Sequence, residues 1–191
     1  MNLGVLVSGR GSNLRNLLDL YFPVVAVATN RDACGGAHIA RERNIPLGVF
    51  PQRDFDSAAA RDAAMAGWLR QMNVELVVCA GYDRVLTGGL LDAFPGRMVN
   101  IHPSLLPAFG GGMDAVRQAL DHGVKITGCT VHLVDATVDG GPILAQAAVA
   151  VHDDDTPESL HGRIQAQEHR ILPEAIRLLS DRLSATRPPL G

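Results

Sequence analysis

An amide, an imidazole and a carboxylate stand at positions from which a fold could assemble a reaction centre. Asn100 and His102 lie two residues apart in an Asn-Ile-His-Pro sequence, and Asp139 follows His102 by 37 positions in a Val-Asp-Gly-Gly-Pro turn. An amide can donate a hydrogen bond to a developing oxyanion, and an imidazole can do the same or move a proton. A carboxylate can orient that imidazole and raise its basicity. The trio suits acyl transfer to a neutral amine, so the sequence predicts an enzyme.

Short apolar runs alternate with helical patterns through the first hundred residues. Continuous apolar runs are typical of parallel strands that are covered on both faces. The predicted strands are Leu3 to Val7, Val24 to Ala28, Leu47 to Phe50, Leu76 to Cys79 and Met98 to Ile101. The predicted helices are Ser12 to Leu20, Gly36 to Arg43, Phe55 to Met72 and Gly88 to Ala93. This alternation predicts an α/β fold with a doubly wound, Rossmann-like, mostly parallel sheet.

The pattern changes after His102. A helix near Asp114 to His122 leads to two strand-like runs, Ile126 to Val134 and Ile143 to Val151, which are joined by a short turn. So short a link favours antiparallel neighbours, and we expect antiparallel strands at this end of the sheet. A long helix from Pro157 to Ser180, capped by Thr156, closes the fold, and residues 187–191 are expected to be irregular.

The placement of the polar trio favours a functional role. His102 ends the fifth apolar run, and ligands of open α/β sheets bind outside the carboxyl ends of the strands. Asn100 points to the same side of an extended strand as His102. Asp139 has a second interpretation, because Asp-Gly is a common hairpin turn, and Asp135 could serve that turn equally well.

A glycine-rich turn, Ser8 to Leu14, joins the first predicted strand to the first helix. Such a turn exposes backbone amides and the positive end of the helix dipole, which suits a phosphate. It lacks the third glycine of a dinucleotide fingerprint and the Gly-Lys-Ser/Thr ending of a P-loop. The alternative is a tight turn in which Ser12 or Asn13 merely caps the helix.

Two further segments carry weaker signals. Gln165 and Glu168 lie three residues apart on one face of the last helix, and their simplest interpretation is a solvated surface. The segment Gly81 to Leu86 follows the fourth strand and could line a pocket for a flat heterocycle.

Composition narrows the class of protein. The chain has 191 residues, enough for one substantial core, and a net charge of −3, which disfavours general nucleic-acid binding.

Cys34, Cys79 and Cys129 form no Cys-x-x-Cys pair, so we expect neither disulfides nor zinc, and a reducing cytoplasm fits. The histidines show no ligand spacing, so no metal is expected. No apolar run approaches the roughly 20 residues that span a bilayer, so no membrane association is expected.

Four segments together resemble the glycinamide ribonucleotide formyltransferase family, the folate-dependent enzymes of purine biosynthesis. They are Ser8 to Leu14, Asn100 to Pro107, Asp139 to Pro142 and Gln165 to His169. The resemblance extends over nearly the whole chain. It implies one formyltransferase catalytic domain over residues 1–191, with a phosphate- and substrate-binding half, 1–100, and a folate-binding and catalytic half, 101–191.

The resemblance also implies an activity and its residues. The formyl group of 10-formyltetrahydrofolate passes to the primary amine of glycinamide ribonucleotide, in a cytoplasmic monomer or homodimer without a metal. By analogy the catalytic residues are Asn100, His102 and Asp139. The implied substrate-binding residues are Gly11, Ser12, Asn13, Gln165 and Glu168. The residues implied for the pterin are Arg84, Val85, Leu86, Asp135, Ala136, Thr137, Val138 and Asp139.

The chain departs from the family pattern at one cationic position. Members often carry a basic residue just after Phe-Asp-Ser that helps to bind phosphate, but here Ala58, Ala59 and Ala60 follow. Arg61, about one helical turn further on, and Arg10, within the glycine-rich turn, are the two candidates to replace it.

Other functions are disfavoured in turn. Methionyl-tRNA formyltransferase and formyltetrahydrofolate hydrolase share the trio but carry an extra domain, for which we expect no room in 191 residues. A dinucleotide oxidoreductase would need an acidic residue after the second strand, where Asn30 and Arg31 stand. A non-catalytic folate- or phosphate-binding module of the same fold remains the alternative, because a fold alone does not establish activity.

Overall fold

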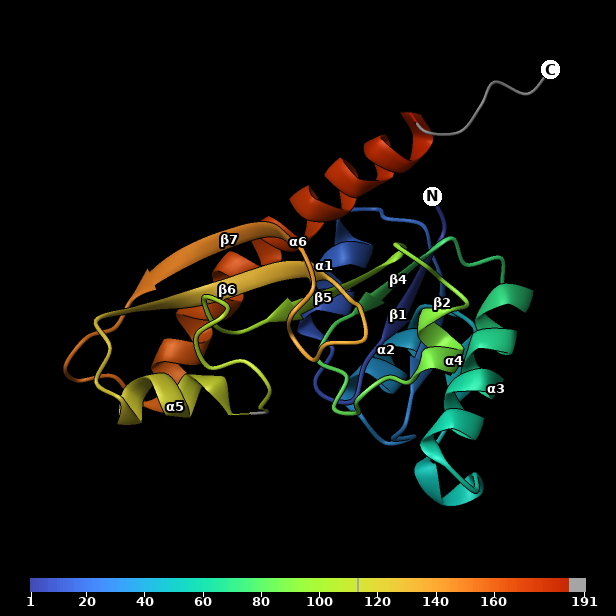
Figure 1. Cartoon of the computed structure of the whole chain (residues 1–191), viewed down its shortest axis with the longest axis horizontal. Helices are drawn as coiled ribbons and strands as arrows, with labels where there is room; N and C mark the ends of the chain where they lie inside the picture. Colours follow the sequence, from blue (N-terminus) through green and yellow to red (C-terminus); the bar gives the residue numbers. More distant parts are fainter. Residues whose placement is uncertain (113, 186–191) are drawn as a thin grey trace.

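The computed structural model describes residues 1–112 and 114–185 and contains one seven-stranded sheet in the order β3-β2-β1-β4-β5-β6-β7 (Figure 1). The strands are β1 (Leu3–Leu6), β2 (Val24–Thr29), β3 (Leu47–Val49), β4 (Leu76–Cys79), β5 (Met98–His102), β6 (Ile126–Leu133) and β7 (Ile143–Ala150). Each predicted apolar run forms a strand, with ends that differ by a residue or so. The predicted tail, 187–191, lies outside the described residues.

The first five strands pair in parallel, whereas β6 runs antiparallel to both β5 and β7. The predicted mixed sheet is therefore confirmed. The strand order reverses between β1 and β4, because the chain builds outward to β3 and then returns to the other side of β1. In open α/β sheets this switch point, at the carboxyl ends of the strands, is where ligands bind.

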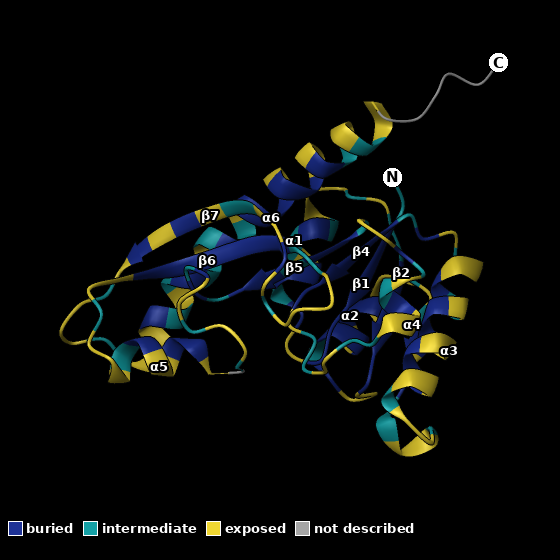
Figure 2. Ribbon diagram, viewed as in Figure 1, coloured by how far each residue is buried: buried dark blue, intermediate teal, exposed yellow. Residues whose placement is uncertain are grey.

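Helices cover both faces of the sheet (Figure 1). They are α1 (Ser12–Asp19), α2 (Gly35–Glu42), α3 (Ala58–Gln71), α4 (Gly88–Leu91), α5 (Ala115–Asp121) and α6 (Pro157–Ala185), with a 3₁₀ turn at Gln52–Asp54. Successive strand residues face opposite sides, so Val5 packs in the core beneath α1, α2, α5 and α6, whereas Leu6 packs in the core beneath α3 and α4. Burial follows this layering: β1 and β6 are dark, the edge strand β7 carries yellow bands, and the helices are exposed on one side (Figure 2).

Three helix boundaries differ from the predicted ones by more than one residue. The helix predicted from Phe55 begins at Ala58, because Ser57 caps it by accepting a hydrogen bond from the Ala60 amide at 3.1 Å. The short α4 ends at Leu91, two residues before the predicted end. The last helix continues past Ser180 to Ala185.

The start of α6 agrees with the sequence. The Thr156 hydroxyl accepts a hydrogen bond from the Ser159 amide at 3.2 Å, and the Ser159 hydroxyl accepts one from the Thr156 amide at 3.0 Å. Thr156 therefore caps α6, as the sequence predicts. No helix in the described part of the chain is both long enough and apolar enough to cross a membrane.

Candidate active site

A cavity of about 380 Å³ opens at the carboxyl ends of β4 and β5, beside the switch point of the sheet. Its walls come from segments that lie far apart in the sequence, namely Gly81–Leu86, Asn100–Pro103, Gly111–Gly112 and Val134–Asp139, together with Cys79 and His132. The trio of Asn100, His102 and Asp139 lies here, and so do all eight residues predicted for the pterin. The structure therefore brings these two predicted groups together.

The trio meets through side-chain contacts. The Nδ1 atom of His102 lies 3.6 Å from Oδ2 of Asp139, and the Asn100 amide nitrogen lies 3.5 Å from Oδ1 of Asp139. The side chains of His102 and Asp139 are only 8% and 14% exposed. Asn100 and His102 share one face of β5, as their two-residue spacing predicts.

The turn between β6 and β7 assigns different roles to its two aspartates. Asp135 accepts a hydrogen bond from the Thr137 amide at 2.8 Å and so stabilises the local turn. Asp139 has a φ of 52° and accepts from the Gly111 amide at 2.8 Å, so its carboxylate points away from its own turn. The Asp135 side chain therefore stabilises the turn, whereas Asp139 takes part in the turn through its backbone and its carboxylate reaches the trio.

His132 belongs to this cluster, although the sequence interpretation did not select it. It stands opposite Asn100 in the β5–β6 register and is buried. Its Nε2 atom lies 3.1 Å from the Asn100 amide nitrogen and 3.6 Å from Oδ1 of Asp139. Its Nδ1 atom lies 2.8 Å from the carbonyl oxygen of Leu133. His132 has no metal-ligand spacing in the sequence, and only the strand register reveals its position beside Asn100.

The Asp139 carboxylate sits among groups that favour its charged form. The contact with His132, the Gly111 amide and the charge of His102 together hold the pKa of Asp139 at about 2, although burial acts in the opposite direction. An ionised carboxylate therefore faces two imidazoles in a largely buried site.

The second ring nitrogen of His102 also has a partner. Nε2 lies 3.0 Å from the carbonyl oxygen of Phe109, a residue with a φ of 56°. A substrate that takes a hydrogen bond from this nitrogen must displace that carbonyl. The loop after β5 therefore has to adjust when a reactant engages Nε2.

The residues predicted for the phosphate and ribose form a second cluster, where α1 meets α6. Gln165 donates to the Ser12 hydroxyl at 2.7 Å, and Asn13 donates to Glu168 at 2.9 Å. Gly11, with a φ of 78°, is the N-cap of α1. The side chains of Ser12 and Asn13 thus contact α6, so the alternative in which one of them caps α1 is wrong.

Glu168 is not a solvated surface residue. It is only 7% exposed, and burial raises the pKa of its carboxyl group, partly offset by the Asn13 hydrogen bond and the charge of Arg10. The solvated-helix interpretation is therefore wrong at this position. The buried carboxylate lies 2.9 Å from the Asn13 amide nitrogen, beside the glycine-rich turn.

The two candidate cations differ in burial and in their partners. Arg61 is 2% exposed and forms an ion pair with Asp62 at 2.7 Å, so the hypothesis that Arg61 meets the phosphate is wrong. Arg10 precedes Gly11, and its Nη2 atom lies 3.3 Å from Nε2 of His161. Burial, followed by the charge of Arg10, lowers the pKa of His161.

The chain matches known proteins over most of its length. A family model described as formyl transferase matches residues 1–176. The chain belongs to the formyl transferase family. Within the described residues, this formyl transferase contains no group of three or more His, Cys, Asp or Glu side chains that could hold a metal ion.

Relatives of this formyl transferase share most of its length. Phosphoribosylglycinamide formyltransferase of Mycobacterium tuberculosis is 46% identical over 183 residues, which cover 93% of this chain and 84% of that protein. The trifunctional purine biosynthetic protein adenosine-3 of Bos taurus is 40% identical over 184 residues, which cover 93% of this chain and 18% of that protein. The crystal structure of glycinamide ribonucleotide transformylase 1 from Symbiobacterium toebii superposes with a TM-score of 0.91 and 49% identity, covering 95% of this chain and 88% of that one. The predicted fold class is thereby confirmed.

Proposed function

We propose that this formyl transferase moves the formyl group of 10-formyltetrahydrofolate to the primary amine of glycinamide ribonucleotide. The products are formylglycinamide ribonucleotide and tetrahydrofolate, and residues 1–191 act as one catalytic domain. The observation that carries the proposal is the convergence of Asn100, His102 and Asp139 at one cavity. The names of the relatives, phosphoribosylglycinamide formyltransferase and glycinamide ribonucleotide transformylase, support the choice of acceptor.

The pterin of the donor occupies the cavity between two irregular segments. Arg84–Leu86 forms one wall and Asp135–Asp139 forms another. Irregular backbone presents amides and carbonyls that suit the hydrogen-bonding edge of a pterin. A volume of about 380 Å³ falls within the range of roughly 300–1,000 Å³ that is usual for small-molecule sites.

The acceptor binds at the cluster between α1 and α6. Its phosphate meets the backbone of Gly11, Ser12 and Asn13 at the amino end of α1, where amides and the helix dipole favour an anion. Arg10 supplies the cation, because Arg61 is committed to Asp62. The ribose hydroxyls donate to Glu168, with Gln165 beside it.

The reaction forms one C–N bond and breaks another. The neutral glycyl amine attacks the formyl carbon, and the carbonyl electrons move to oxygen to give a tetrahedral oxyanion. Asn100 and the protonated imidazole of His102 donate hydrogen bonds to that oxyanion. Asp139 stays ionised, holds His102 in place and helps to pass a proton, through water, from the attacking nitrogen to the folate nitrogen that leaves.

A spectrophotometric assay of the purified chain with 10-formyltetrahydrofolate tests the proposal. It is run with glycinamide ribonucleotide, with aminoimidazole carboxamide ribonucleotide and without an acceptor. Turnover with glycinamide ribonucleotide alone is expected. Equal turnover without an acceptor would indicate a hydrolase, and turnover with the second nucleotide alone would change the acceptor. Folate binding without turnover would indicate the non-catalytic module.

A further inference from the structure

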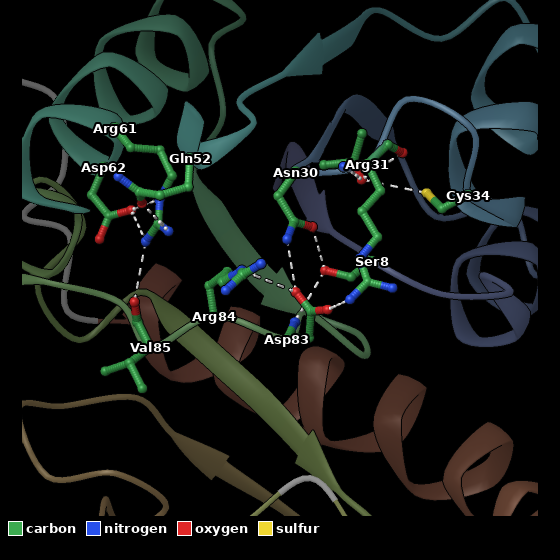
Figure 3. A network of polar contacts seen from close by, with 11 residues as sticks. Ser8, Asn30, Arg31, Cys34, Gln52, Arg61, Asp62, Asp83, Arg84 and Val85 are labelled. Atoms are coloured by element: carbon green, nitrogen blue, oxygen red, sulfur yellow. Dashed lines mark hydrogen bonds and ion pairs between the residues drawn. The ribbon is translucent and has the colours of Figure 1, made fainter. Parts of the chain in front are cut away.

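One wall of the cavity is the irregular segment Gly81–Leu86, and polar groups hold it at both ends (Figure 3). At its start, the Ser8 hydroxyl accepts a hydrogen bond from the Asp83 amide at 3.0 Å. At its end, the segment meets Arg61 and Asp62, two consecutive residues of α3. The sequence interpretation considered Arg61 only as a phosphate ligand, and nothing in the proposed reaction uses Asp62.

The contacts of this pair are directed at the backbone of the wall. Arg61 donates to the carbonyl oxygen of Val85 at 3.2 Å and to the Gln52 side chain at 3.0 Å. Asp62 accepts from the Thr87 amide at 2.7 Å. The two side chains also bind each other, with Nε of Arg61 2.8 Å from Oδ1 of Asp62. One cation and one anion thus fix a carbonyl and an amide that lie two residues apart.

Because the pair is buried, a gain in folding stability does not explain its presence. The side chains are 2% and 0% exposed, and removing two charges from water carries a large desolvation penalty. Apolar residues of similar volume often stabilise a fold as well or better. Apolar side chains, however, cannot fix the direction of a backbone carbonyl and amide.

We propose that Arg61 and Asp62 are positioning residues for the formyl donor. They hold the backbone from Val85 to Thr87 in place, so that the wall is set before the pterin binds and little ordering has to occur on binding. Neither residue lines the cavity, so the pair acts through the segment that does. This inference rests on the proposed function, because the segment is assigned there to the donor.

The test compares variants that keep the charge of the interior balanced. The double variant Arg61→Met/Asp62→Leu removes both charges and so leaves no unpaired buried ion. We expect it to raise the KM for 10-formyltetrahydrofolate about tenfold, as for the loss of roughly one net hydrogen bond. The KM for glycinamide ribonucleotide should stay within about twofold, because only donor binding is affected. Arg61→Lys keeps the charge but not the forked donors, and should give an intermediate donor KM.

Leu69→Ala provides the matched control. Leu69 is buried on the same helix, its side chain lies near Gly4, and it does not line the cavity. This variant should lower the free energy of unfolding without changing the ratio of the two KM values. If the double variant fails to fold, Arg61→Lys alone decides. An unchanged donor KM in the folded variants, or a parallel rise in both KM values, would overturn the inference.

Amide hydrogen exchange separates this inference from the proposed function. The Thr87 amide, bonded to Asp62, should exchange faster in the double variant than in the wild type, and this readout needs no turnover. Absence of turnover in the wild-type chain would refute the proposed function. Unchanged Thr87 exchange in the double variant would refute the positioning role, whatever the activity.

Discussion

Nδ1 of His102 lies 3.6 Å from Oδ2 of Asp139, although the two residues are 37 positions apart in the chain. The contact exists because β6 pairs antiparallel with β5 and the turn after β6 folds back toward the end of β5. Asn100 and His132, opposite each other in the same register, complete the surroundings of the carboxylate. Sheet pairing thus assembles four polar side chains at one end of the cavity.

Removal of either proposed oxyanion donor should abolish most turnover. Loss of one such donor typically costs about 2.7–4 kcal/mol of barrier, so Asn100→Ala and His102→Ala should each lower kcat at least about a hundredfold. Steady-state kinetics measures the loss, and circular dichroism checks that the fold persists. His152→Ala is the control: it changes an exposed histidine outside the trio and should keep normal turnover. Near-normal turnover in either Asn100→Ala or His102→Ala would refute the assigned roles.

Ionisation of Asp139 should make the free energy of unfolding depend on pH in the acid range. Its folded pKa of about 2 lies below the unperturbed value of about 3.9. The unfolded chain therefore binds the proton more readily, and the stabilisation is fully present above about pH 4 and is lost as the pH falls toward 2. Urea unfolding of wild type and Asp139→Asn should show a stability difference that shrinks from about pH 5 to about pH 2.5. A difference that is constant with pH would contradict the depressed pKa.

The ionised Glu168 carboxylate should lower the stability of the fold and strengthen the binding of the acceptor. Burial raises its folded pKa, so its contribution to stability is present at low pH and is lost as the pH rises through that folded value. At pH 8 Glu168→Gln should therefore raise Tm by roughly a few degrees, an advantage that disappears in acid.

The same variant should bind the acceptor less well. Glu168→Gln should raise the KM for glycinamide ribonucleotide at least about tenfold, because the ribose loses a charged acceptor. Glu174→Gln, on an exposed part of the same helix, is the matched control and should change neither quantity substantially. If Glu168→Gln is stabilised but its KM for glycinamide ribonucleotide is unchanged, Glu168 has a structural role only.

Arg10 should act through the phosphate alone. Arg10→Gln should raise the KM for glycinamide ribonucleotide about tenfold, the loss expected for a charge-assisted contact. Arg10→Gln should hardly change the KM for the dephosphorylated riboside. Arg15→Gln tests for a general charge effect, because Arg15 lies on α1 and is about half exposed. An equal effect of Arg10→Gln on both acceptors would exclude a phosphate contact.

The secondary structure was largely predictable because it depends on local patterns. The first five predicted strands are mainly apolar runs, and the two faces of such a strand are buried in different cores, as Val5 and Leu6 show. The helix start at Ala58 was missed because the Ser57 cap overrides the apolar pattern that begins at Phe55. The antiparallel end of the sheet followed from the short turn after β6.

By itself the sequence determined the α/β elements and the shared face of Asn100 and His102, since both depend on neighbours within a few residues. Only the tertiary structure decided that Asp139, and not Asp135, meets His102, and that His132 joins them. It also decided that Arg61 is buried against Asp62. These outcomes depend on strand register and on the packing of distant segments, and register and burial are set by contacts that no local pattern contains.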